Sequence, residues 1–138
     1  MTDSGDPSNV ATEALLPTQP TAIAPDGSAV RLLCSASGGS FAHFELPAGQ
    51  TSRAVRHRTI TEIWYITEGL GQMWRGERPD AGREIDLRPG VCLTIPPATS
   101  FQFRSTSAGP LAAVAVTLPP WPGDGEAIST QGPWHATV

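Results

Sequence analysis

The stretch GQTSRAVRHRTITEIWYITEG, residues 49–69, decides the fold of this chain. It contains two runs that read as β-strands, Ser52–Thr59 and Glu62–Thr67, and a glycine stands at each of its ends. A second stretch, GVCLTIPPATSFQFRS, residues 90–105, is built in the same way, with short apolar runs on either side of a Pro-Pro pair. Short runs of this type, bounded by Gly and Pro, predict β-strands joined by tight turns.

The rest of the chain continues this pattern in both directions. Turn signals such as PDG at 25–27, PAG at 47–49 and RPG at 88–90 separate nearly every pair of runs. No segment after residue 20 shows a convincing helical period. Eight or nine short strands at this spacing predict an all-β barrel or sandwich. The predicted strands are Ala29–Ser35, Ser40–Leu46, Ser52–Thr59, Glu62–Thr67, Gln72–Arg75, Glu84–Leu87, Val91–Ile95, Ser100–Arg104 and Leu111–Leu118.

The first stretch resembles the first sequence motif of the cupin superfamily. In that motif a glycine is followed by two histidines, a glutamate and a closing glycine. Gly49, His57, Glu62 and Gly69 stand at the matching positions of this chain, with the spacing of the motif. Val55 stands where the family has its first histidine.

The second stretch is similar to the second cupin motif, which has glycine, proline, glycine, histidine and asparagine in that order. The residues of this chain at those positions are Gly90, Pro96, Ala98, Phe101 and Ser105. The first two match the motif, and the last three differ from it. The strings EIWYITEG and IPP are also typical of the superfamily. The resemblance implies a small, single-domain cupin: one all-β, jelly-roll barrel.

Composition divides the chain into a barrel and two flanking parts. Residues 1–18 are polar, small and interrupted by proline, which predicts a flexible N-terminal tail, and residues 19–138 form the expected barrel domain. The C-terminal segment LPPWPGDGEAISTQGPWHATV is rich in proline and carries Trp121 and Trp134. Two bulky aromatic residues in an irregular segment predict that it lies across the barrel and buries them.

The resemblance carries over less well to metal chemistry. In metal-binding cupins, three histidines and a glutamate converge inside the barrel on iron, manganese, zinc or nickel. Here His57 and Glu62 match that set, whereas Val55 and Phe101 have no electron pair to donate. Stable sites usually have three or four protein ligands, so we expect no tight cofactor and only a weak, incomplete metal site. Binding of a divalent metal remains an alternative if other side chains, such as His43 or Gln72, complete the ligand set.

Strand alternation predicts which side chains surround the His57–Glu62 pair inside the barrel. Apolar walls with a few convergent polar groups suit a small organic ligand. Core packing is the alternative role for the aromatic residues of this set, and Arg53 is either a surface residue or the anchor of a ligand carboxylate. The expected lining is Arg53, Val55, Thr59, Trp64, Ile66, Phe101 and Phe103.

Three functions remain as alternatives. The favoured one is a cupin that binds a small molecule without a tight metal, as a sensor, carrier or accessory protein. The second is an enzyme: either His57 and Glu62 transfer protons, as in an isomerase, epimerase or cyclase, or replacement ligands hold a metal. Burial raises the pKa of such a carboxyl, and a neighbouring imidazolium lowers it. The pair is alternatively a hydrogen-bonded relic in an apolar core.

The third alternative is a structural or interaction module. Because cupins commonly pair through β-strands, the resemblance implies a homodimer, and pairing would also protect exposed edge strands. A polar barrel interior, or one filled solid by its own side chains, would favour this alternative.

Charge and composition argue against other classes of partner. The net charge is −4 and the nine basic residues are scattered, so we expect no nucleic-acid surface. No apolar run approaches the roughly 20 residues that span a membrane, and the N-terminus lacks the features of a signal peptide. We therefore expect a cytoplasmic protein without a membrane partner, in which Cys34 and Cys92 are free, buried thiols.

Overall fold

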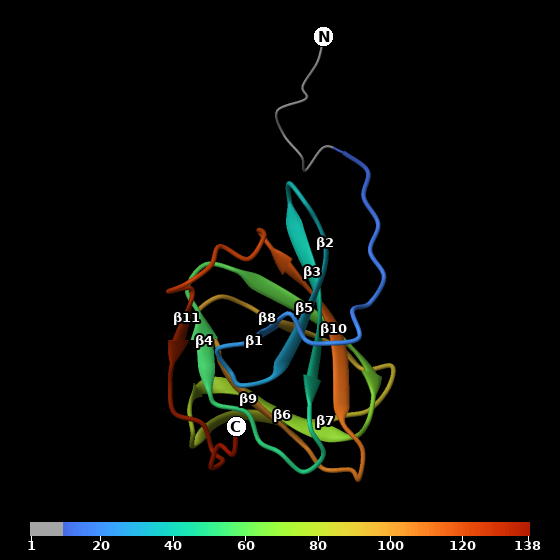
Figure 1. The fold of residues 1–138 in the computed structure, drawn as a ribbon. Helices are drawn as coiled ribbons and strands as arrows, with labels where there is room; N and C mark the ends of the chain where they lie inside the picture. The colour runs from blue at the N-terminus through green and yellow to red at the C-terminus, as the bar shows by residue number, and fades with distance from the viewer. Residues whose placement is uncertain (1–9) are drawn as a thin grey trace.

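Eleven strands and no helix make up the part of the chain that the computed structural model describes, residues 10–138 (Figure 1). The runs of β-branched and aromatic residues form the strands, and Gly or Pro occupies many of the turns between them. None of the described segments is a helix long and apolar enough to cross a membrane. The strands are β1 (Ala22–Ile23), β2 (Ala29–Ala36), β3 (Gly39–Leu46), β4 (Val55–His57), β5 (Thr61–Glu68), β6 (Gly71–Arg78), β7 (Ala81–Leu87), β8 (Cys92–Ile95), β9 (Ser100–Ser105), β10 (Leu111–Leu118) and β11 (Ala127–Ser129).

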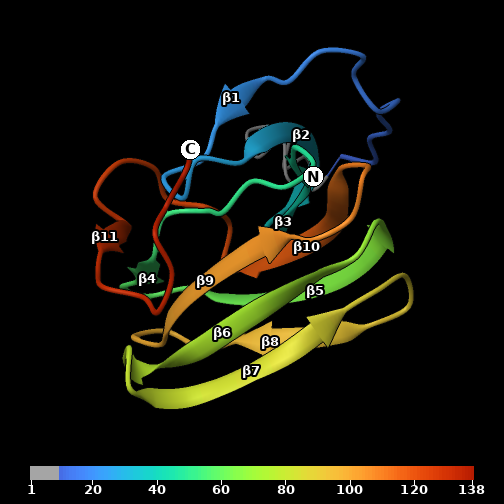
Figure 2. The same ribbon diagram turned by 90° about the horizontal axis from the view of Figure 1, so that it is seen from below.

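The strands form two antiparallel sheets that pack face to face (Figure 2). The first sheet has the order β1-β2-β3-β10-β5-β8, and the second has the order β11-β4-β9-β6-β7. Many neighbours are distant in sequence: β10, for example, pairs with both β3 and β5. Two packed antiparallel sheets between which the chain crosses in this way form a jelly-roll barrel, as expected.

All nine predicted strands are present, with ends that differ by a few residues. The largest difference lies in Ser52–Thr59, of which only Val55–His57 is regular strand. The sequence does not predict β1 and β11, because two or three residues show no readable alternation.

The described part of the N-terminal tail has no regular secondary structure. Residues 10–18 run along the barrel, where Nε of Arg31 donates a hydrogen bond to the carbonyl of Pro17 over 2.9 Å. The prediction of flexibility for residues 1–9 falls outside the described residues.

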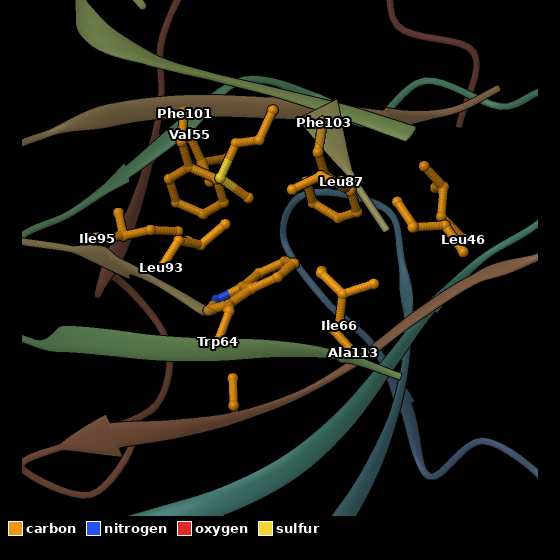
Figure 3. Close-up of a cluster of buried hydrophobic side chains, with 13 residues drawn as sticks. Leu46, Val55, Trp64, Ile66, Leu87, Leu93, Ile95, Phe101, Phe103 and Ala113 are labelled. Carbon is orange, nitrogen blue, oxygen red and sulfur yellow. The ribbon is translucent and has the colours of Figure 1, made fainter. Parts of the chain in front are cut away.

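The core lies between the two sheets and consists of inward-facing side chains from nearly every long strand (Figure 3). Trp64 is at its centre, edge-on to Phe103 and Phe101 with ring centroids 5.1 and 6.3 Å away, and stacked on Phe44 at 5.4 Å. Each large side chain buried here stabilises the fold by roughly 1.5–3 kcal/mol. The buried cluster is Leu46, Val55, Trp64, Ile66, Met73, Leu87, Leu93, Ile95, Phe101, Phe103, Leu111, Ala113 and Ala115.

The C-terminal segment crosses the outer face of the second sheet. Gln102 of β9 is 1% exposed: its amide N–H groups donate to the carbonyls of Ser52 and Trp134, and its oxygen accepts from the backbone N–H of Trp134. The guanidinium of Arg104 lies 4.1 Å from the centroid of the Trp134 ring. The expected burial of both tryptophans is wrong, however, because Trp134 is half-buried and Trp121 is 37% exposed.

Both cysteines are free thiols, as expected, but the expected burial is wrong. Cys34 is half-buried near the end of β2, where the register with β3 shifts. Cys92 is exposed because side chains alternate along the edge strand β8, and Leu93 takes the inward position.

Candidate functional site

A cavity of about 270 Å³ opens at one end of the barrel, beside the filled core. Strands β1, β2 and β3, together with the turn between β1 and β2, supply most of its wall, and Trp121 closes part of it from the C-terminal segment. The polar side chains His57 of β4 and Glu62 of β5 are buried in it. The cavity is lined by Ala22, Ile23, Ala24, Pro25, Asp26, Val30, Leu32, Ser40, Phe41, Ala42, Phe44, Val55, His57, Glu62, Thr117 and Trp121.

His57 is held in place by β4, which pairs with β11 opposite Ala127. Its side chain is packed between two rings, with centroids 5.3 Å from Phe101 and 5.5 Å from Trp121. Burial lowers the pKa of His57 to about 4, and the negative charge of Glu126 opposes this shift only in part. The imidazole is therefore neutral at neutral pH. Its Nδ1 is buried without a hydrogen-bond partner among the described residues.

Glu62 belongs to β5, between Thr117 of β10 and Ile95 of β8. Its Oε1 accepts a hydrogen bond from the indole Nε1–H of Trp64 over 3.0 Å. Burial raises the pKa of Glu62 to about 7; the bond from Trp64 opposes the rise, and the charge of Asp26 adds to it.

The two side chains do not form a tight ion pair. Nδ1 of His57 lies 3.9 Å from Oε1 of Glu62, which is too far for a hydrogen bond. The expected lowering of the carboxyl pKa by a neighbouring imidazolium is absent, because burial keeps His57 neutral. The cavity thus holds a neutral base beside a carboxyl that titrates near neutral pH.

Asp26 is a cavity residue that the sequence analysis missed. It lies in the β1–β2 turn and is 5% exposed, and its Oδ1 accepts hydrogen bonds from the backbone N–H and hydroxyl of Ser28 at 2.8 and 2.6 Å. Burial raises the pKa of Asp26, while the bonds from Ser28 and the charge of Arg53 act against the rise. The PDG triplet predicts only a turn, and no local signal shows that this turn closes over the barrel.

Of the predicted pocket residues, Val55 lines the cavity. Trp64, Ile66, Phe101 and Phe103 are buried inside the barrel, but they belong to the packed core and not to the cavity wall. The alternative role of core packing therefore describes these four residues (Figure 3).

Arg53 and Thr59 lie outside the barrel, and their predicted place in the lining is wrong. The prediction assumes strand alternation over Ser52–Thr59, whereas the regular strand covers only Val55–His57. Arg53 is exposed and donates from Nε to the carbonyl of Val138. The hydroxyl of Thr59 donates to Oε1 of Glu126.

The side chains inside the barrel do not fit the family's metal. Val55 and Phe101, the two residues at lost ligand positions, face each other across β4 and β9. His43 lies between Ala42 and Phe44 on β3. Both of these side chains face inward, so that of His43 points out of the barrel. Gln72 lies opposite Asp86 on the outer face and accepts from Arg104. Within residues 10–138, no three His, Cys, Asp or Glu side chains are grouped to hold a metal ion.

A family model of the cupin domain matches residues 42–117, more than half of the chain and all of both motifs. The chain belongs to the cupin family. An uncharacterized protein of Methanocaldococcus jannaschii, MJ1618, is 28% identical to this cupin over 104 residues, which cover 72% of this chain and 79% of that protein.

Solved structures give the same fold. BH2720 of Bacillus halodurans superposes with a TM-score of 0.63 and 20% identity over 72% of this chain and 76% of that one. The formate complex of Lactobacillus farciminis oxalate decarboxylase reaches 0.66 with 19% identity over 80% of this cupin, which spans only 33% of the decarboxylase. Structural similarity at about 20% sequence identity establishes the barrel fold of this chain and says nothing about its activity.

Proposed function

We propose that this cupin binds a small, largely apolar organic molecule in the cavity at the end of the barrel. The observation that carries the proposal is an open, mainly apolar space of about 270 Å³ that retains unused hydrogen-bonding capacity. Nδ1 of His57 has no partner, and Glu62 has a partner only at Oε1 among the described residues. An unsatisfied buried polar group costs about 1–3 kcal/mol, so a ligand that supplies the partner gains that free energy.

The size of the cavity limits the ligand. An apolar cavity of about 150 Å³ admits benzene, and this one is nearly twice as large. A single ring with a substituent, or a short branched chain, would fit. The hydroxyls of Ser40 and Thr117 also line the wall, but they bond to each other, which leaves Asp26, His57 and Glu62 as the polar side chains with hydrogen-bonding capacity to spare.

Chemical-shift mapping with a library of small fragments tests this proposal. Bound fragments are expected to shift the backbone amides of β1, β2 and β3 in the wild-type protein. Ala42→Phe, which places a ring in the cavity, should abolish those shifts, and Val114→Phe on the opposite face of the same sheet is the matched control. Fragment binding that survives in Ala42→Phe, or no binding at the cavity by any fragment, would overturn the proposal.

A role as sensor, carrier or accessory protein fits binding of this kind better than redox chemistry does. Redox cupins depend on a full ligand set, whereas among the described residues His57 and Glu62 alone remain of that set. We therefore place the protein among cupins that hold a molecule without a tight metal.

The paired pKa shifts of His57 and Glu62 favour a second candidate, an enzyme that transfers protons. A neutral imidazole can accept a proton, and a carboxyl with a pKa near 7 can donate one, within a single, mainly apolar cavity. NMR of an identified ligand in D₂O tests this: deuterium incorporation that requires both His57 and Glu62 supports an isomerase-type reaction. Binding without exchange in the wild type would eliminate it.

The homodimer implied by the family resemblance stays a prediction. Light scattering coupled to size-exclusion chromatography measures it directly, and a mass of one chain, 14.5 kDa, would contradict it. A purely structural module needs no open cavity. A dimer that also binds a ligand in the cavity would therefore favour the small-molecule-binding cupin over the structural module.

A further inference from the structure

The ionisable side chains that line the cavity are acidic, apart from the neutral His57. Asp26 and Glu62 present carboxyls to it, and both are at least nine-tenths buried. No lysine occurs in the sequence, and none of its arginines lines the cavity. The cavity therefore has no cation of its own to balance these two carboxyls.

Three of the arginines bond to groups outside the cavity. Arg31 bonds to Glu45 over 2.8 Å on the outer face of β2 and β3. Arg75 donates to the carbonyl of Thr94. Arg53 is close enough to influence Asp26, but its Nε bonds to the C-terminal carbonyl. None of these three arginines lines the cavity.

The unpartnered ring nitrogen of His57 and the aromatic side chains of the cavity wall also suit a positively charged group. His57 is 4% exposed, and its unpartnered Nδ1 lies 3.9 Å from Glu62. A neutral imidazole nitrogen and two carboxyls can each accept a hydrogen bond, and a primary ammonium has three N–H donors. The wall also contains the rings of Phe41, Phe44 and Trp121, whose faces attract cations.

We propose that the cavity selects a small organic cation, a protonated aryl- or alkylamine, over a carboxylate of the same shape. This inference rests on the proposed function, because it names the class of molecule that the same cavity takes. An anion would lose its hydration and meet two carboxyls with no compensating positive side chain. A cation would lose its hydration but gain a charge-assisted hydrogen bond, and such bonds are the stronger kind.

Three probes with one ring and different charge test the selection: benzylamine, benzyl alcohol and benzoate. Titration calorimetry at pH 8, where Glu62 is ionised, is expected to rank them amine, alcohol, carboxylate. A hydrogen bond between charged groups is stronger than the one that the alcohol makes, so the amine should bind about tenfold more tightly than the alcohol. Benzoate binding as tight as that of benzylamine would overturn the inference.

Variants separate this inference from the proposed function. Glu62→Gln should remove the preference for benzylamine while benzyl alcohol still binds, and Asp26→Asn provides a second, independent removal of charge. Glu68→Gln is the matched control, since Glu68 is exposed on the same strand. If alcohol and amine bind equally, the charge selection fails and the proposed function stands. If none of the three probes binds to any form, the charge selection fails as well, and the fragment mapping decides the proposed function.

Discussion

The indole Nε1–H of Trp64 donates to Oε1 of Glu62 over 3.0 Å, two residues away on the same strand. Residues two apart on a strand share a face, so both side chains point into the barrel, and neither is more than 3% exposed. The bond connects the centre of the core to the only carboxyl that β5 presents to the cavity. Stability and chemistry are therefore coupled at this pair.

Trp64→Phe tests that coupling. The substitution removes the donor to Glu62 and leaves a void in the core, so we expect a loss of about 2–4 kcal/mol in the free energy of unfolding. The pKa of Glu62 should also rise further, because the bond from Trp64 holds it down. Denaturant unfolding and carboxyl ¹³C NMR measure the two effects, and an unchanged pKa would contradict the assigned contact.

The stability of the protein should depend on the ionisation of Glu62. Burial raises its folded-state pKa from the ordinary 4.5 to about 7, so the unfolded chain loses the proton first. Relative to Glu62→Gln, the wild type should lose stability as the pH rises from about 4.5 to about 7, by about 3 kcal/mol. Unfolding curves of both proteins between pH 4 and 8 measure this difference. A difference that stays constant over this pH range would show that the pKa of Glu62 is the same in the folded and unfolded states.

The pKa of His57 should have the opposite effect on stability. Burial lowers its folded-state pKa from 6.5 to about 4, so the unfolded chain takes up the proton first as the pH falls. The stability contributed by the neutral ring is complete above pH 6.5 and is lost towards pH 4. Long-range ¹H–¹⁵N spectra should show a neutral ring at pH 5.5. A protonated ring at that pH would contradict the burial argument, and His57→Gln should remove this part of the pH dependence.

Metal binding should depend on the two replaced ligands. The wild-type protein, purified without a histidine tag, should contain well below one transition metal per chain by elemental mass spectrometry. Val55→His combined with Phe101→His restores three histidines on the paired strands β4 and β9, with Glu62 on β5 of the other sheet. We expect about one zinc per chain after loading, since such sites take three or four ligands. Stoichiometric metal in the wild type would instead show that other side chains complete the site.

Gln102→Leu should release the C-terminal segment from the second sheet. The amide of Gln102 makes two hydrogen bonds to the backbone of Trp134 and one to that of Ser52, all at 3.1 Å or less. Their loss leaves backbone groups unpaired, so we expect about 2–3 kcal/mol of destabilisation. Hydrogen exchange at the N–H of Trp134 should become much faster. Thr94→Leu at an exposed position of β8 is the control, and equal exchange in both variants would contradict the assigned role.

The sequence is sufficient for most of the fold because its signals are local. Alternation within each strand and the Gly and Pro residues between strands identify nine of the eleven strands of the described residues, and the two motifs identify the family. Alternation also places His57, Glu62 and Val55 correctly inside the barrel, since each lies within a regular strand. It fails at Arg53 and Thr59, which lie just beyond the ends of β4.

The cavity itself was decided only by the tertiary structure. Asp26 from a turn and Trp121 from an irregular segment reach His57 and Glu62 because distant parts of the chain pack together, and neither carries a local signal of that contact. The same packing determines that Phe101 and Trp64 fill the core while the space beside them stays open. Strand periodicity specifies the face on which a side chain lies, whereas the volume left between two sheets depends on every side chain that enters it.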